Sequence, residues 1–174
     1  LKDLINIEFL QNLRKKFLIS SGLPAVGEKN SGGGLYEVNL QGPKWELRKV
    51  YSGTVHGIIK IMNGYAISDS TNGVVLLDKN YKIRKKGKHL LNTRAHGIAF
   101  DNYKNMFYVA CSNTDKIIVL DDNLKFLDSI SISDKFQKYN LPQHHINDLC
   151  IVDQNLYVSM FSISGNHKRN IYDG

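Results

Sequence analysis

The stretches His56-Gly57-Ile58-Ile59 and His96-Gly97-Ile98-Ala99 decide the fold, because they begin two units that repeat after 40 residues. Each unit continues with a polar turn, a second short apolar strand, a turn rich in Ser, Thr, Asn and Asp, and a third strand. Both third strands run into matching hairpins, Asp78-Lys79-Asn80 and Asp121-Asp122-Asn123, where Asp and Asn tolerate tight-turn geometry. The shared element order indicates an internal repeat.

A third unit begins at His145-Ile146-Asn147-Asp148, 49 residues after His96. The extra residues are expected to form a loop over residues 133–143. Four short strands in about 40 residues is the period of a β-propeller blade. The chain is therefore predicted to be all-β and part of a β-propeller, with about three to four blades of four short antiparallel strands. An all-β sandwich is the alternative.

The first residues differ from the rest of the chain. Asp3 is placed to cap a helix, and an apolar residue recurs at every third position, at Leu4, Ile7, Leu10 and Leu13. This pattern predicts a short helical segment over residues 1–15, followed by the partial propeller over residues 16–174. Closed propellers have about four to eight blades, and an open ring leaves strand edges exposed. We therefore expect the remainder of its own chain, or another chain, to complete the ring.

Composition limits the partners. The net charge is +7, but the basic run at residues 82–88 has no interleaved aromatics, so we expect a solvated strand end and no nucleic-acid partner.

No stretch approaches the ~20 apolar residues of a membrane span. Cys111 and Cys150 lie in apolar runs, which predicts buried, reduced thiols and favours a reducing, cytoplasmic compartment.

Three histidines are the candidate catalytic residues. The innermost strand of each blade lines the central channel, so His56, His96 and His145, read as equivalent, are predicted to converge at one mouth. Imidazole suits acid–base chemistry because its pKa lies near neutrality. In the alternative, each histidine bonds to the next blade and joins the blades, while the following glycine permits close packing. His144 is expected to point away from this pocket.

Asn147 and Asp148 are the candidate metal ligands, since their side-chain oxygens suit Ca²⁺. Alternatively, the two residues close the turn that enters the strand. The nearby segment 165–169 is expected to be a solvated polar loop; the alternative is that it presents His167 and Arg169 to an anionic ligand.

The His-Gly-Ile strand starts and the segment Ile146-Asn147-Asp148-Leu149 resemble those of the six-bladed calcium-dependent gluconolactonase, paraoxonase and strictosidine-synthase-like group. The resemblance implies hydrolysis of lactones or esters, with Asn147 as a calcium ligand and His56 or His96 as a base. The group's early acidic ligand has no clear match; Glu28 and Glu37 are the candidates. Residues 32–36 and 157–162 also resemble an uncharacterised bacterial β-propeller family without an established activity.

Two functions follow from these patterns. The first is a His/Asn/Asp-lined central pocket for a small molecule, serving a divalent-metal-dependent hydrolase or lyase. The second is a non-catalytic propeller that binds a protein or a carbohydrate through exposed aromatic residues. The candidates for that surface are Trp45, Tyr51, Tyr139 and Phe161.

Overall fold

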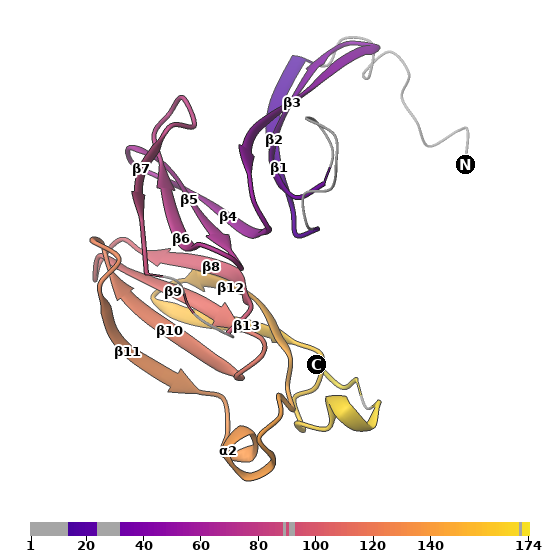
Figure 1. The fold of residues 1–174 in the computed structure, drawn as a ribbon, viewed down its shortest axis with the longest axis vertical. Coiled ribbons are helices and arrows are strands. Elements are labelled where there is room, and N and C mark those ends of the chain that lie inside the picture. The colour runs from indigo at the N-terminus through magenta and orange to yellow at the C-terminus, as the bar shows by residue number, and fades with distance from the viewer. Residues whose placement is uncertain (1–13, 24–31, 89, 91–92, 171) are drawn as a thin grey trace.

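The computed structural model describes residues 14–23, 32–88, 90, 93–170 and 172–174. Within these ranges the chain forms four antiparallel sheets that follow one another along an arc (Figure 1). The predicted helical segment 1–15 lies outside the described residues, apart from Arg14 and Lys15, with which the first strand begins.

The four sheets follow chain order. Sheet A consists of β1 (Arg14–Ser21), β2 (Gly34–Gln41) and β3 (Lys44–Ser52). Sheet B consists of β4 (Val55–Ile61), β5 (Gly64–Asp69), β6 (Gly73–Leu77) and β7 (Ile83–Lys86). Sheet C consists of β8 (Ala95–Asp101), β9 (Met106–Cys111), β10 (Lys116–Asp121) and β11 (Phe126–Ser131). Sheet D consists of β12 (Ile146–Val152) and β13 (Asn155–Met160).

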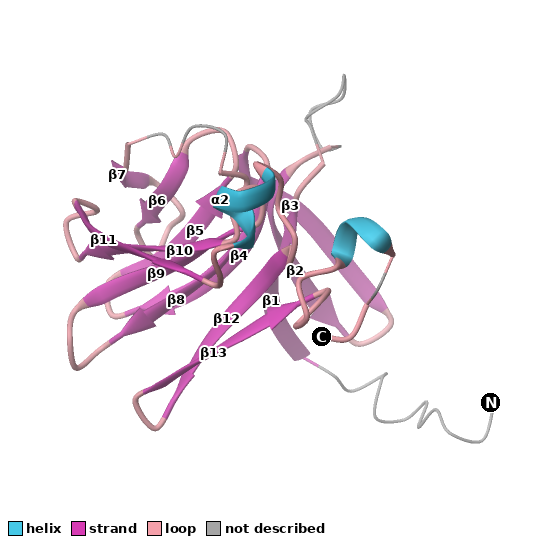
Figure 2. Ribbon diagram, turned by 90° about the horizontal axis from the view of Figure 1, so that it is seen from below, coloured by secondary structure: helices cyan, strands magenta, loops and turns pink. Residues whose placement is uncertain are grey.

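The inner strands β4, β8 and β12 pack side by side, and the later strands of each sheet lie progressively farther out (Figure 1). Helix is confined to two short pieces within the described loops, α2 (Lys135–Tyr139) and η2 (His167–Arg169) (Figure 2). This arrangement confirms the predicted all-β, partial β-propeller. No helix in the described ranges is long and apolar enough to cross a membrane.

Each interface between sheets has its own apolar cluster. The cluster between sheets B and C includes Val74, Leu76, Ile98, Phe107 and Leu124. Similar clusters lie between sheets A and B and between sheets C and D. Because both faces of a central sheet are covered, its strands are apolar at nearly every position.

The matching hairpins are confirmed. The Oδ1 atom of Asp78 accepts the backbone N–H groups two and four positions later, both at 2.8 Å. Asp121 does the same at 2.9 and 2.7 Å. The residues that close these turns, Tyr81 and Leu124, share a left-handed φ of 64° and 61°. The two repeats thus form the same type of turn, with the same hydrogen bonds to the aspartate.

The register of the third unit differs from the prediction by two residues. Asp148 pairs with Ser159 on β13 as Gly57 pairs with Ser68 on β5. Asn147, and not His145, therefore holds the strand-start position of His56. The register is set by burial, because Ile146 is the buried counterpart of the residues before His56 and His96.

Sheet A begins at the second strand of its blade. Ser20 on β1 donates a hydrogen bond to the carbonyl of His56 at 3.2 Å, as Ser68 on β5 donates one to the carbonyl of His96. β1 is therefore the counterpart of β5. Among the described residues no strand pairs with the inner edge of β1, so sheet A is a partial blade within these ranges.

Two smaller expectations need correction. The loop predicted for residues 133–143 contains the helix α2. Cys111 is buried as predicted, but Cys150 is exposed, and the prediction for it was wrong. Cys150 lies on the face of β12 that no further described sheet covers, so an apolar run did not guarantee burial there.

Candidate functional site

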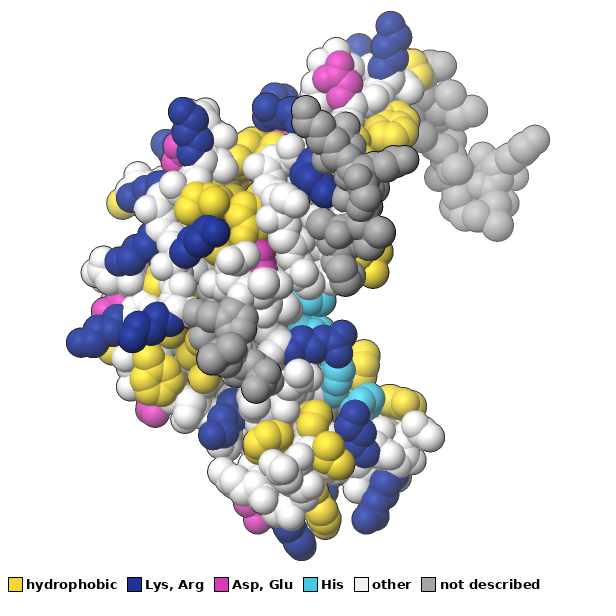
Figure 3. Space-filling view, in the orientation of Figure 1, with side chains coloured by type: hydrophobic (Ala, Val, Ile, Leu, Met, Phe, Trp, Pro, Cys, Tyr) yellow, Lys and Arg dark blue, Asp and Glu magenta, His cyan; other side chains and the backbone are white. Residues whose placement is uncertain are grey.

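Histidine side chains line up along the hollowed side of the molecule (Figure 3). The second residues of the neighbouring inner strands β4, β8 and β12 are His56, His96 and Asn147, respectively. The fold therefore brings together the strand starts that the sequence repeat predicts at His56 and His96.

The imidazoles form a continuous row. The rings of His56 and His96 stack with centroids 4.4 Å apart and an interplanar angle of 6°. The ring of His145 meets His96 edge-on at 5.8 Å, and His167 lies 4.8 Å from His145. The predicted convergence of His56, His96 and His145 is thus seen in the structure. We call these four histidines the histidine row.

Aromatic residues extend the row at one end. The ring of Phe161 stacks on His145 at 4.7 Å, and Tyr172 lies 5.6 Å from His167. Lys168 and Arg169 are exposed, as expected for a solvated loop, but His167 is partly buried and packs against His145. The short helix η2 holds it there.

Backbone hydrogen bonds around the row join neighbouring blades. Besides the serine contacts to the carbonyls of His56 and His96, the N–H of Gly57 donates to Ser68 Oγ at 2.9 Å. A Cβ added at Gly57 would lie 2.7 Å from the carbonyl oxygen of His96, so glycine permits this close approach. The inter-blade role foreseen for the histidines is therefore carried by their carbonyls, which leaves the rings available.

A buried carboxylate positions His145. Asp115 accepts the backbone N–H groups of three consecutive residues, 143–145, including His144 and His145 at 2.9 Å each. His145 has a left-handed φ of 52°, as does Arg94, with 49°, at the matching position before His96. Because this conformation is costly for a residue with a side chain, Asp115 fixes a strained turn at the site.

His144 lies outside the row, as expected. Its Nδ1 faces the carbonyl of Ser162 at 2.8 Å and therefore carries the proton. Its Nε2 accepts the hydroxyl of Ser133 at 2.7 Å. Both ring nitrogens of this buried residue are satisfied, which makes His144 structural.

The histidine row is neutral at pH 7. Burial lowers the pKa of His96 to about 4, helped by the repulsion that a protonated His56 and Arg94 would exert, while Asn147 acts in the opposite direction. Burial also lowers the pKa of His56, His145 and His167. Neutral imidazoles can donate and accept hydrogen bonds at the same time.

Two ring nitrogens in the row are buried and lack a hydrogen-bond partner among the described residues, Nε2 of His96 and Nδ1 of His167. Unpaired buried polar atoms are uncommon in native structures because each costs about 1–3 kcal/mol. When such atoms are found, a ligand or catalytic role is one of the accepted explanations.

The candidate metal ligands lie apart. Asn147 is half-buried beside His96, whereas Asp148 is exposed, accepts the N–H of Leu149 at 2.9 Å, and lies on the open face with Cys150. In the described ranges no three His, Cys, Asp or Glu side chains form a group that could hold a metal ion. The residues present therefore do not assemble the six or more oxygen ligands that Ca²⁺ prefers. Calcium stays a prediction from the resemblance.

The candidates for the early acidic ligand do not complete such a set. Glu28 lies outside the described residues. Glu37 lies on β2, where it accepts a hydrogen bond from Tyr81 at 2.7 Å and pairs with Arg48 at 3.0 Å.

The aromatic residues considered for a binding surface divide into two groups. Tyr51 is buried and donates a hydrogen bond to Asp69 at 2.8 Å, so it belongs to the core. Trp45, Tyr139 and Phe161 are exposed.

Solved structures with the same fold support the assignment of a partial β-propeller. Glutaminyl cyclase from Myxococcus xanthus matches with a TM-score of 0.53 and 12% identity over 82% of this chain and 68% of that chain. Virginiamycin B lyase from Staphylococcus aureus matches with 0.55 and 11%, over 86% and 54%. An auxiliary nutrient binding protein from Bacteroides thetaiotaomicron matches with 0.54 and 11%, over 86% and 44%.

These likenesses concern the fold alone, because identity is low. The chain spans about half the length of the lyase and less of the nutrient binding protein. No protein-family model and no curated protein sequence matches the chain.

Proposed function

We propose that the histidine row is the floor of a central small-molecule pocket with hydrolase or lyase chemistry. The observation that carries the proposal is the unpaired Nε2 of His96, set within a row of neutral imidazoles. A ligand atom placed there would satisfy a buried polar group that no described residue satisfies.

The chemistry follows from the protonation state. A neutral imidazole can accept a proton from water or substrate, or donate its N–H to an oxygen that gains negative charge. With a pKa of about 4, His96 suits the second role better, because it is a weak base at pH 7. His56 and His145 flank it in the row.

The ligand class follows from the surroundings. The imidazoles and Phe161 are aromatic side chains that can pack against a planar group. Arg94 acts electrostatically on three histidines of the row, and Lys168 on His145 and His167. A planar molecule with an anionic group, or one that develops negative charge, therefore fits this pocket.

The fold by itself does not choose between catalysis and binding. The structural neighbours include a cyclase, a lyase and a nutrient binding protein, so one fold serves both roles. The exposed Trp45, 65% accessible on β3, favours a protein- or carbohydrate-binding module as the second candidate.

The test uses an aromatic lactone, dihydrocoumarin, and its anionic hydrolysis product, 3-(2-hydroxyphenyl)propanoate, which carries a planar ring. We expect the product to shift the ring signals of His56, His96 and His145 in NMR spectra of the chain, and the lactone to be hydrolysed. The same experiment with added CaCl₂ or EDTA tests the calcium prediction. Signals that stay unchanged with both compounds would favour the binding-module alternative.

A further inference from the structure

The interface between sheets A and B departs from the apolar pattern of the repeat. Sheet registers make Lys60 on β4 the counterpart of Phe100 on β8, and Tyr65 the counterpart of Phe107. By the same comparison Glu37 takes the position of Leu76, and Tyr81 that of Leu124. At the next interface those four positions form one hydrophobic cluster.

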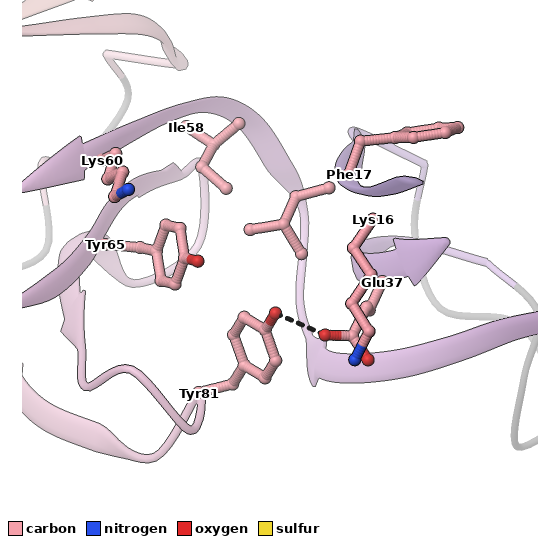
Figure 4. A pocket seen from close by; sticks show the side chains of 8 residues that line it. Lys16, Phe17, Glu37, Ile58, Lys60, Tyr65 and Tyr81 are labelled. Carbon is pink, nitrogen blue, oxygen red and sulfur yellow. Dashed lines mark hydrogen bonds between the residues drawn. The ribbon is translucent and has the colours of Figure 1, made fainter. Parts of the chain in front are cut away.

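These polar replacements surround a cavity of about 380 Å³ (Figure 4). Lys60, Ile58 and Tyr65 lie on one side, and Lys16, Phe17 and Glu37 on the other. We call this space the A–B cavity. It lies between β1, β2, β4 and β5 and shares no lining residue with the histidine row.

The carboxylate in the cavity is already satisfied. Tyr81 donates to Glu37 at 2.7 Å, and Arg48 pairs with the other carboxylate oxygen at 3.0 Å. The hydrogen bond from Tyr81 lowers the pKa of Glu37, against the effect of burial, so the group is ionised and paired at pH 7.

The remaining charge is positive. In the described part of the chain the ion pairs are Arg48–Glu37 and Lys104–Asp101, so the ammonium of Lys60 has no carboxylate partner. Lys16 lines the opposite side. Leu18, Ile58 and Tyr65, which belong to one hydrophobic cluster, add apolar surface. A cation above apolar walls is complementary to an organic anion.

We propose that the A–B cavity binds a small organic anion, a carboxylate with a compact apolar or aromatic body. The body lies against Leu18, Ile58 and Tyr65, and the carboxylate pairs with Lys60. This site is independent of the function proposed for the histidine row, because the two have no residue in common. The repeat supplies its own control, since the equivalent interface has a phenylalanine where the site has Lys60.

The experiment compares 4-phenylbutyrate with 4-phenylbutanol, which share a body and differ in charge. Each is titrated into the 174-residue chain while the amide signals of Ile58, Tyr65 and Tyr81 are followed by NMR. We expect the acid to bind with a Kd between about 0.1 and 1 mM, because small ligands gain limited energy per atom. The alcohol should bind at least about 10-fold more weakly, because it lacks the charged hydrogen bond to Lys60.

Variants assign the effect to the site. Lys60→Phe restores the residue of the neighbouring interface and should weaken binding of the acid at least about 10-fold without lowering the melting temperature. Lys60→Met is the second variant if that chain fails to fold. Lys44→Phe, the same change at the exposed first residue of β3, should leave binding unaltered. The proposal is overturned if acid and alcohol bind equally, if neither shifts these signals, or if both Lys60 variants bind the acid like the unmodified chain.

Discussion

The imidazole rings of His56 and His96 lie parallel, 4.4 Å apart, although they begin strands of two different sheets. Their carbonyl oxygens meanwhile accept hydrogen bonds from serines of the preceding sheets. The backbone of these residues thus joins the blades while the side chains face the hollow side of the molecule. This division of roles gives predictions that separate structure from function.

Ser68→Ala tests the joint between blades. The change removes the bond to the carbonyl of His96 and leaves the N–H of Gly57 without its acceptor. We expect a loss of about 1–3 kcal/mol in the free energy of unfolding, measured with urea. Ser52→Ala, at an exposed strand end, should change it by less than about 0.5 kcal/mol. Equal stability of the two variants would show that this serine does not join the sheets.

Gly57→Ala tests the close approach of β4 and β8. The added Cβ would lie 2.7 Å from the carbonyl oxygen of His96 and 3.1 Å from the Cα of Gly97, both of which are backbone atoms. We expect a loss of about 1–3 kcal/mol because the strands must move apart. Gly87→Ala meets its nearest atom, the carbonyl oxygen of Val74, only at 3.1 Å and should cost less. The reverse order would contradict the tight contact.

Asp115→Asn tests the strained turn before His145. The carboxylate accepts three backbone N–H groups, and an amide has only one acceptor oxygen. We expect a loss of at least about 1–3 kcal/mol and a changed environment of His145, seen in its ring signals. Asp122→Asn is the exposed control. Unchanged His145 signals would show that Asp115 does not position this ring.

The pH dependence of stability tests the neutral row. The folded pKa of His96, about 4, lies below the ordinary value of 6.5, so the unfolded chain binds more protons between these values. The contribution of His96 to stability is therefore complete above about pH 6.5 and is lost as the pH falls through 4. Unfolding measured at pH 7, 5.5 and 4.5 should show this decline, and His96→Asn should reduce it. A decline of equal size in the variant would assign it to other groups.

The sequence predicted the blades well because each repeat marks its own strands and turns. Asp78 and Asp121 identified two hairpins, and His56 and His96 identified two strand starts. The third unit was misplaced because His145 resembled these histidines, whereas the buried Ile146 sets the register.

Part of the site has no local sequence signal. His167 joins the row through its contact with His145, which lies far from it in the chain. The A–B cavity has no local sequence signal either, because the equivalence of Lys60 and Phe100 follows from the pairing of their strands. The position of His167 and the A–B cavity both depend on contacts between distant parts of the chain, which composition and periodicity do not predict.

The most direct test of the central claim is His96→Asn, with activity and stability measured on the same protein. Asparagine already occupies the matching position at Asn147, so the fold should tolerate it. The account predicts that hydrolysis of dihydrocoumarin falls by about 100-fold while the free energy of unfolding at pH 7 changes by less than about 1 kcal/mol. Unchanged hydrolysis, or a loss that follows a fall in stability, would show that His96 serves the structure and not a reaction.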